Sequence, residues 1–474
     1  MSTDGTRRGR ALRRRQRAFA GALAGVLGVL AVLGLAGGAV SAVQGPRVTQ
    51  VQVDPAASTQ ASGSRVIFTT NQSLQPVDVA QVDVEPAAPF LLDTVGRSVG
   101  LRFTLPLRDD TDYTVRISDV AGLGGGPTTT IVERFHTPPL SAFVLRRSSG
   151  GDTIVRTDLE GRAQTVFEHS HIEDFRATSG HLVISTLDDE GNARLLVTDL
   201  EGQNERELPM PGPGTVMSLQ AADRGELIGY TFSDANLGEG GGRESALYVA
   251  SAKESAKDDP PTAVAVPGDE TRVADWRFVP DTDSILVLTY DSRMLLSGAD
   301  GADATDLGNG VAIDGIARGS SVAIVQRSDD IYRVDLTDGA QTPLAPAKGV
   351  VGAQGVITPI PGEGAGTVRQ FLQVDAALGE QVTNVYRVDD DGATTELATV
   401  PAGDAVMQTC VSPSGRYVAL LVAPSIVDNT YDTYLMPMPR QLETRILELA
   451  DGSEVATIPG FGLSWCQTPP PLSQ

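Results

Sequence analysis

The sequence predicts an all-β protein, and two features of the chain indicate this. Gly and Pro are frequent, with 51 and 29 residues, and they separate short runs rich in Val, Thr, Ile and Leu. Such runs between turn residues are typical of β-strands. The second feature is a strand followed by a turn that recurs along most of the chain. At 474 residues the chain is too long for one hydrophobic core, so two or three domains are expected.

Residues 1–17 form a basic tail. They carry seven Arg against Asp4, a local charge of +6, whereas the whole chain carries −23. The remainder therefore carries −29 and is strongly acidic. An acidic surface repels nucleic acid, so we expect no nucleic-acid partner.

Residues 18–43 contain no charged side chain and consist almost entirely of Ala, Gly, Val and Leu. About 20 apolar residues span a bilayer as a helix, whereas roughly 7–15 form the core of a signal peptide. The length predicts a single-pass transmembrane anchor, and the Arg cluster places residues 44–474 on the extracytoplasmic side of the cell membrane. A long cleavable signal peptide is the alternative, because Val40-Ser41-Ala42 ends in the small residue that a signal peptidase needs. Both interpretations place the body outside the cytoplasm.

Residues 47–138 are predicted to form a β-sandwich. The runs 66–70, 99–104 and 113–117 alternate apolar with polar side chains, which is the period of half-buried strands. The stretches RVIFTTNQSL (65–74), VGLRFTLPL (99–107), DDTDYTVRI (109–117) and FHTPP (135–139) resemble bacterial Ig-like domains that follow an export signal. The resemblance implies an Ig-like domain that serves as a spacer or an adhesion module.

Residues 140–468 repeat one unit. A strand that feeds a turn recurs as TIVRTDLEG (153–161), ARLLVTDLEG (193–202), MLLSGADG (294–301), IYRVDLTDG (331–339), VYRVDDDG (385–392) and RILELADG (445–452), with a degenerate copy at 246–254. A second strand precedes each copy. The spacing, from about forty to the mid-fifties, is typical of four-stranded propeller blades. The seven units therefore predict a seven-bladed β-propeller, followed by a Pro-rich tail at 469–474.

The first unit lacks its innermost strand, which we expect to come from the other end of the chain. Residues 462–466 are similar to the inner strands predicted at 273–278 and 405–411. A C-terminal strand placed there completes the first blade and closes the ring, which removes open sheet edges.

The repeats resemble a known family. VSPSGRYVALL (411–421) and the strand-D-x-x-G hairpins are similar to the TolB-like and WD40-like (PD40-type) propellers of exported bacterial proteins. The resemblance spans residues 140–467 and implies the fold, but a fold does not by itself fix a partner.

The chain has two cysteines, Cys410 and Cys466. In an oxidising compartment an isolated pair predicts a disulfide, and two thiols provide too few ligands for structural zinc. Aligning Pro413 with Pro469 places Cys466 opposite Cys410 on the inner strands of neighbouring blades. The predicted disulfide would hold the ring closed.

Two motifs could carry chemistry. Residues 96–100 match the G-x-S-x-G nucleophile elbow, but a strand follows where the elbow needs a helix, so we interpret them as a turn. His169, His171 and Glu173 would share one face of an extended segment and could hold a divalent metal. The other interpretation, a solvated polar connector between blades, is favoured because nothing provides second-shell support. No cofactor is otherwise expected.

A long connection at 424–443 contains apolar residues where a loop would be polar. Tyr431, Tyr434, Met436 and Met438 are residue types typical of interface anchors. Alternatively, this loop covers a blade or plugs the central channel, because a bare apolar loop is costly. The longest connections share one face of the predicted propeller, and we expect binding there.

The sequence thus predicts a membrane-anchored, extracytoplasmic binding or scaffold protein of the cell envelope. Its propeller face would bind an envelope protein or a glycan. The alternative is a propeller-based hydrolase or lyase that acts on glycan, with a metal site near residues 168–174.

Overall fold

The computed structural model describes residues 45–238, 241–299, 304–374 and 381–471, together with Val26 and Val29. The predicted basic tail and almost all of the predicted membrane anchor lie outside these residues. Among the helices that are described, none is long and apolar enough to cross a membrane. The chain divides into two compact units, and the second unit includes Pro55–Ser64, Phe103–Thr111 and the residues from His136 onward.

The first unit contains two antiparallel sheets. The first has the order β1-β2-β5-β4 and the second β3-β6-β7. Their strands are β1 (Val48–Gln52), β2 (Arg65–Thr70), β3 (Val82–Glu85), β4 (Phe90–Val95), β5 (Ser98–Phe103), β6 (Asp112–Val120) and β7 (Thr129–His136). Side chains along β2, β5 and β6 alternate between buried and more exposed, as the two-residue period predicts. The short helix α2 (Pro55–Gln60) belongs to the second unit, whereas η1 (Val79–Gln81) occupies a connection of the first unit. The Ig-like character of this unit remains a prediction.

The G-x-S-x-G motif lies on a hairpin of this unit. Gly96 and Arg97 form the turn between β4 and β5, and Gly96 has a φ of +59°. Ser98 begins a strand rather than a helix, as the sequence predicts. This geometry is that of an ordinary hairpin turn.

From Ala142 onward, the described residues of the second unit form seven consecutive antiparallel sheets, each in simple up-and-down order. The first three comprise β8 (Ala142–Arg146), β9 (Asp152–Thr157) and β10 (Ala163–His169); β11 (Asp174–Ala177), β12 (His181–Leu187), β13 (Ala193–Asp199) and β14 (Arg206–Glu207); and β15 (Gly214–Ala221), β16 (Leu227–Asp234), β17 (Ala246–Ser251) and β18 (Thr262–Ala263), with η2 (Glu254–Ala256) before β18.

The next four sheets follow the same plan. They comprise β19 (Val273–Phe278), β20 (Ser284–Thr289), β21 (Arg293–Gly298) and β22 (Thr305–Asn309); β23 (Ala312–Ile316), β24 (Val322–Gln326), β25 (Ile331–Asp335) and β26 (Gln341–Pro343); β27 (Ala353–Pro359), β28 (Thr367–Val374), β29 (Gln381–Val388) and β30 (Thr394–Val400); and β31 (Ala405–Val411), β32 (Tyr417–Ala423), β33 (Glu443–Glu448) and β34 (Glu454–Pro459).

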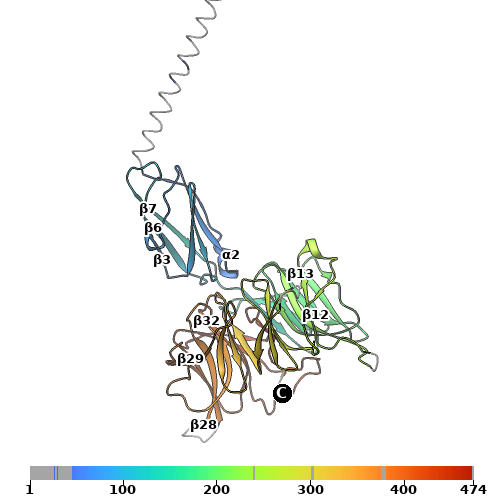
Figure 1. Cartoon of the computed structure of the whole chain (residues 1–474). Coiled ribbons are helices and arrows are strands. Elements are labelled where there is room, and N and C mark those ends of the chain that lie inside the picture. The colour runs from blue at the N-terminus through green and yellow to red at the C-terminus, as the bar shows by residue number, and fades with distance from the viewer. Residues whose placement is uncertain are drawn as a thin grey trace, which may run out of the picture. The chain divides into compact units, whose positions relative to one another are not determined.

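The sheets are arranged side by side around a centre. The first strands of successive sheets contact one another from β11 through β15, β19, β23 and β27 to β31. The second and sixth sheets, marked by β12 and β28, lie at opposite sides of this unit (Figure 1). The seventh sheet packs against the first through one core cluster that contains Val144, Ala419 and Trp465. This arrangement is consistent with a β-propeller.

The end of the chain completes the three-stranded first sheet, as expected, but not as a regular strand. Leu145 and Phe461 exchange backbone hydrogen bonds of 2.8 and 3.0 Å, and Ser464 N–H donates to the Phe143 carbonyl. The prediction of a strand at 462–466 is therefore wrong. Gly462 has a φ of +66°, and Cys466 N–H donates to the Leu463 carbonyl, so the backbone turns after one bridge.

Candidate functional site: a central cavity and the loop 424–443

A cavity of about 760 Å³ lies among the first strands of the third to seventh sheets. Each of β15, β19, β23, β27 and β31 contributes to its wall, and residues 467–471 line another part of it. Cavities of a few hundred to about 1,000 Å³ are typical of sites for small molecules or for short segments of a partner. Five sheets converge on this cavity, so side chains from distant parts of the chain share one concave surface.

All five first strands are irregular where they face the cavity. The pairing register shifts at Met217–Gln220, Val273–Asp275, Ile313–Gly315, Gln354–Ile357 and Val406–Gln408. A β-bulge redirects side chains and frees backbone groups from the ladder. The freed groups must find other partners, because a buried, unpaired carbonyl is costly.

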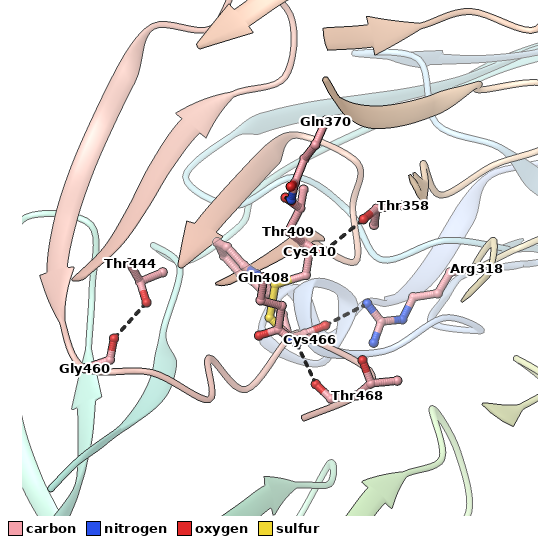
Figure 2. The surroundings of a disulfide bond; sticks show 11 residues. Arg318, Thr358, Gln370, Gln408, Thr409, Cys410, Thr444, Gly460, Cys466 and Thr468 are labelled. Atoms are coloured by element: carbon pink, nitrogen blue, oxygen red, sulfur yellow. Dashed lines mark hydrogen bonds between the residues drawn. A yellow bond between two sulfur atoms is a disulfide. The ribbon is translucent and has the colours of Figure 1, made fainter. Parts of the chain in front are cut away.

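Polar side chains of neighbouring sheets donate to backbone carbonyls on or near these strands. Gln220 Nε2 donates to the Trp276 carbonyl at 2.7 Å, and Arg277 Nη2 donates to the Ile313 carbonyl at 2.9 Å. Thr358 Oγ1 donates to the Thr409 carbonyl at 3.0 Å (Figure 2). These bonds join the third sheet to the fourth, the fourth to the fifth and the sixth to the seventh. The wall of the cavity is thus held by a series of hydrogen bonds between sheets.

Two acidic and two basic side chains lie in the wall. Asp275 pairs with Arg277 on the same strand, and Arg318 Nε donates to Asp223 at 2.9 Å. Asp314 differs, because burial raises its pKa to about 7 while the hydrogen bond from Gln326 opposes that shift. A carboxyl with a pKa near 7 can change its charge under physiological conditions, which is typical of functional clefts.

Three apolar side chains that line the cavity are also exposed. Tyr290, Val311 and Val356 have exposed fractions of 57%, 60% and 40%. Tyr290 lies in the turn between β20 and β21, and Val311 precedes β23. The Arg272 guanidinium lies 5.0 Å from the ring centre of Tyr290. We name these three residues the apolar rim. Exposed aromatic and aliphatic side chains around a cavity are typical of a binding surface.

The predicted disulfide is confirmed and lies beside the cavity. Cys410 on β31 is bonded to Cys466, with a Cα–Cα distance of 5.4 Å (Figure 2). Arg318 Nη1 donates to the Trp465 carbonyl at 3.2 Å, next to the disulfide. The last segment of the chain is therefore fixed to the seventh sheet by a covalent bond and to the fifth sheet by an arginine.

The loop 424–443 folds back on itself. The Asn429 side chain bonds to the backbone of Pro424 and Gln441, and Tyr431 forms a bridge with Pro439. Of the predicted binding residues here, Met436 and Met438 are 8% and 2% exposed, so the prediction that they are exposed anchors is wrong. Met438 belongs to a core cluster with residues of the first two sheets. Met436 lines the cavity.

The Tyr434 side chain also makes its contacts with other residues of the chain. Its hydroxyl donates to Asp152 at 2.8 Å, and its ring stacks on the ring of His171 with centres 4.1 Å apart. The Arg147 guanidinium lies 3.8 Å from the Tyr434 ring centre and donates to Asp432 at 2.8 Å. The loop thus covers the junction of the first two sheets, which is the alternative that the sequence left open. Tyr431, 37% exposed, keeps an accessible side chain.

The three predicted metal ligands are not brought together. His169 Nδ1 lies 3.1 Å from the backbone nitrogen of His171, while His171 Nε2 lies 2.6 Å from Glu173 Oε1. The Glu173 carboxylate accepts the N–H groups of Leu435 and Met436. Among the described residues, no group of three His, Cys, Asp or Glu side chains is placed to hold a metal ion. The polar connector around residues 168–174 and the apolar loop 424–443 contact each other and form one region, although the sequence patterns predicted two separate sites.

Sequence reasoning missed the polar residues of the cavity wall. One signal was available: Asp174-Phe175-Arg176 and Asp275-Trp276-Arg277 place an acid and a base at the same point of two repeats. In both repeats the acid and the base pair with each other. Charged residues inside an apolar strand need such partners, and of these two pairs it is Asp275 and Arg277 that line the cavity.

No protein-family model matches the chain, and no curated protein matches it. Solved structures that resemble it include a TolB-like protein from Agrobacterium tumefaciens, with 14% identity and a TM-score of 0.34 over 68% of this chain and 91% of that one. Another is the uncharacterized protein lmo1340 from Listeria monocytogenes EGD-e, with 10% identity and a TM-score of 0.43 over 66% and 90%. The β-propeller domain of Cps50 (Swd1) from Myceliophteria thermophila has 13% identity and a TM-score of 0.39 over 62% and 89%.

Proposed function

We propose that this chain is an extracytoplasmic binding or scaffold protein of the cell envelope, anchored by residues 18–43. Its seven sheets would form a seven-bladed propeller closed by the end of the chain. The partner, an envelope protein or a glycan, would bind over the cavity and its apolar rim. The cavity carries this proposal, because five sheets build it from mixed polar and apolar side chains and its rim stays exposed.

The loop 424–443 contributes to this surface in a different way than its sequence indicated. It supplies Met436 to the cavity wall and leaves the Tyr431 side chain accessible. Contacts to the first two sheets hold it in place, so it presents a fixed surface. A preorganised surface of this kind reduces the entropy cost of binding.

The test is a matched pair of single substitutions in the exported part of the chain. Val311→Ser changes the rim, whereas Val455→Ser changes an exposed valine on the outermost strand β34. Each variant is immobilised and presented with envelope proteins and, separately, with purified envelope glycans from the source cells. We expect Val311→Ser to lower capture of the partner by about tenfold, since an interface anchor is worth more than 1 kcal/mol. Equal capture by wild type and both variants would refute a binding face at the cavity.

A further inference from the structure

The wall of the cavity is built partly by the end of the chain itself. Thr468, Pro469, Pro470 and Pro471 line the cavity, and Pro470 is buried. Gln408 Nε2 donates to the Thr468 carbonyl at 2.9 Å (Figure 2). We name residues 468–471 the tail segment. It occupies part of the space that a partner at the cavity would need.

The tail segment is attached close to the cavity by the disulfide, but it makes few hydrogen bonds there. Cys466, two residues before it, is fixed by the disulfide, and Arg318 holds the carbonyl of Trp465. Beyond that point, the bond from Gln408 is the one side-chain hydrogen bond that the described residues make to the tail segment. Three of its four residues are prolines, which have no N–H to satisfy. When the segment leaves the cavity, it therefore breaks one side-chain hydrogen bond, the bond from Gln408, and no proline N–H loses a partner.

From this arrangement we infer that the tail segment is an exchangeable occupant of the cavity. It competes with the partner, whose binding element is an extended, proline-bearing peptide segment. The inference rests on the proposed function and selects a peptide over a glycan, because the wall already accommodates a peptide of this kind. Proline-rich segments lose little conformational entropy on binding, which suits them to such a groove.

The tether determines how strongly the tail segment competes. A short linker gives its end an effective concentration on the order of 1 mM. If the same peptide binds freely with a Kd of about 0.1 mM, the tail segment occupies the cavity about nine-tenths of the time. A competing peptide then binds the full chain about tenfold more weakly than it binds a chain without the tail segment.

The experiment uses the full exported chain and a variant that ends at Gln467, which keeps both cysteines. The probe is a fluorescein-labelled peptide with the sequence QTPPPLSQ, that of residues 467–474, and its binding is followed by fluorescence anisotropy. We expect the truncated variant to bind the probe at least about tenfold more tightly than the full chain. Replacing the three prolines of the probe with alanine should abolish this difference. Equal affinity of both chains for QTPPPLSQ would overturn the inference.

Two further measurements separate this inference from the proposed function. In the truncated chain, Gln408→Ala removes the donor to the bound peptide, so probe binding should weaken while circular dichroism confirms the fold. Partner capture is then compared between the full and truncated chains. If the full and truncated chains capture the partner equally well, the tail segment does not compete for the cavity. The binding face would still be supported if Val311→Ser lowered capture. Capture of glycan alone, with no binding of the peptide, would refute the choice of a peptide partner.

Discussion

At the scale of single residues, the ionisation of Asp314 makes the charge of the cavity wall depend on pH. Its Oδ1 accepts a hydrogen bond from Gln326 at 2.9 Å, while Oδ2 is buried with no hydrogen-bond partner in the described part of the chain. Burial without full compensation disfavours the ionised form, which is why the pKa rises from 3.8 to about 7. Arg369 shows the reverse effect, since burial lowers its pKa to about 10.

Asp314→Asn should flatten the pH dependence of stability. A carboxyl whose pKa is raised in the folded state stabilises the fold when protonated, and this stability is lost as pH rises through about 7. The loss amounts to about 1.4 kcal/mol per pH unit between the two pKa values, or about 4 kcal/mol in total. We therefore expect the free energy of urea-induced unfolding to fall less steeply with pH in the variant than in wild type, from about pH 4 to pH 8.

The control for this prediction is Asp258→Asn, which changes an exposed carboxyl in the same unit. Its stability profile should follow that of wild type. If Asp314→Asn and wild type lose stability in parallel as pH rises, Asp314 does not ionise with the raised pKa.

At the scale of strands and turns, two identical motifs have different surroundings. Gly161 and Gly202 both end the sequence Thr-Asp-Leu-Glu-Gly and have φ angles of +83° and +74°. In each turn the preceding aspartate, Asp158 or Asp199, accepts backbone N–H groups, and these bonds lower its pKa. However, a Cβ at Gly202 would lie 1.7 Å from the Val166 carbonyl oxygen of the first sheet, whereas one at Gly161 would meet no atom within 4 Å.

Gly202→Ala should therefore be more damaging than Gly161→Ala. Both substitutions place a side chain in the left-handed region, which costs about 1–2 kcal/mol. Gly202→Ala adds a clash with backbone that must shift, which we expect to cost a further 1–3 kcal/mol or so. Urea unfolding of the two variants measures the difference directly. Equal losses would mean that the second sheet does not pack on β10 as closely as the structure shows.

Most strands could be predicted because their signal is local. The strand that precedes each hairpin has either alternating apolar and polar side chains or apolar side chains throughout, and a turn residue follows it. Examples are β12, β20 and β32. The contacts of the loop 424–443 could not be predicted in this way. Arg147 meets Asp432, 285 residues away along the chain, and nothing in either neighbourhood indicates the pairing. Tyr and Met residues have the same sequence pattern whether they are buried or exposed, so the four anchors were ambiguous.

The candidate site was harder to predict than the fold for the same reason. The cavity wall comes from bulges in five strands, and a bulge depends on pairing with the next strand rather than on local composition. Asp314 lies in an apolar stretch where its burial is visible only after the sheets are assembled. The disulfide was predictable, because two cysteines leave only one possible pairing.

At the scale of the whole molecule, one segment joins the two ends of the series of sheets. Residues 461–466 pair with β8, pack in the core cluster with β32, and carry the disulfide to β31. Without them, β8 would be an open edge strand, and the seventh sheet would lose its covalent link. Open edges favour association with other chains.

Truncation after Gly460 should therefore destroy cooperative folding of the second unit, whereas truncation after Gln467 should not. The shorter chain loses several buried side chains, including Phe461, Leu463, Trp465 and Cys466. Burial of each large apolar side chain contributes about 1.5–3 kcal/mol. The disulfide closes a separation of 56 residues and contributes about 4 kcal/mol. Together these losses approach the whole stability of a typical domain, about 5–15 kcal/mol.

Gel filtration and urea unfolding distinguish the outcomes. The chain that ends at Gly460 should aggregate or unfold without a clear transition, and the chain that ends at Gln467 should elute as wild type does. A full-length chain with both cysteines changed to serine isolates the disulfide, and it should lose no more than about 4 kcal/mol and remain folded. A cooperative, monomeric chain ending at Gly460 would show that the sheets are stable without closure, because the packing between successive first strands would then be sufficient to hold them.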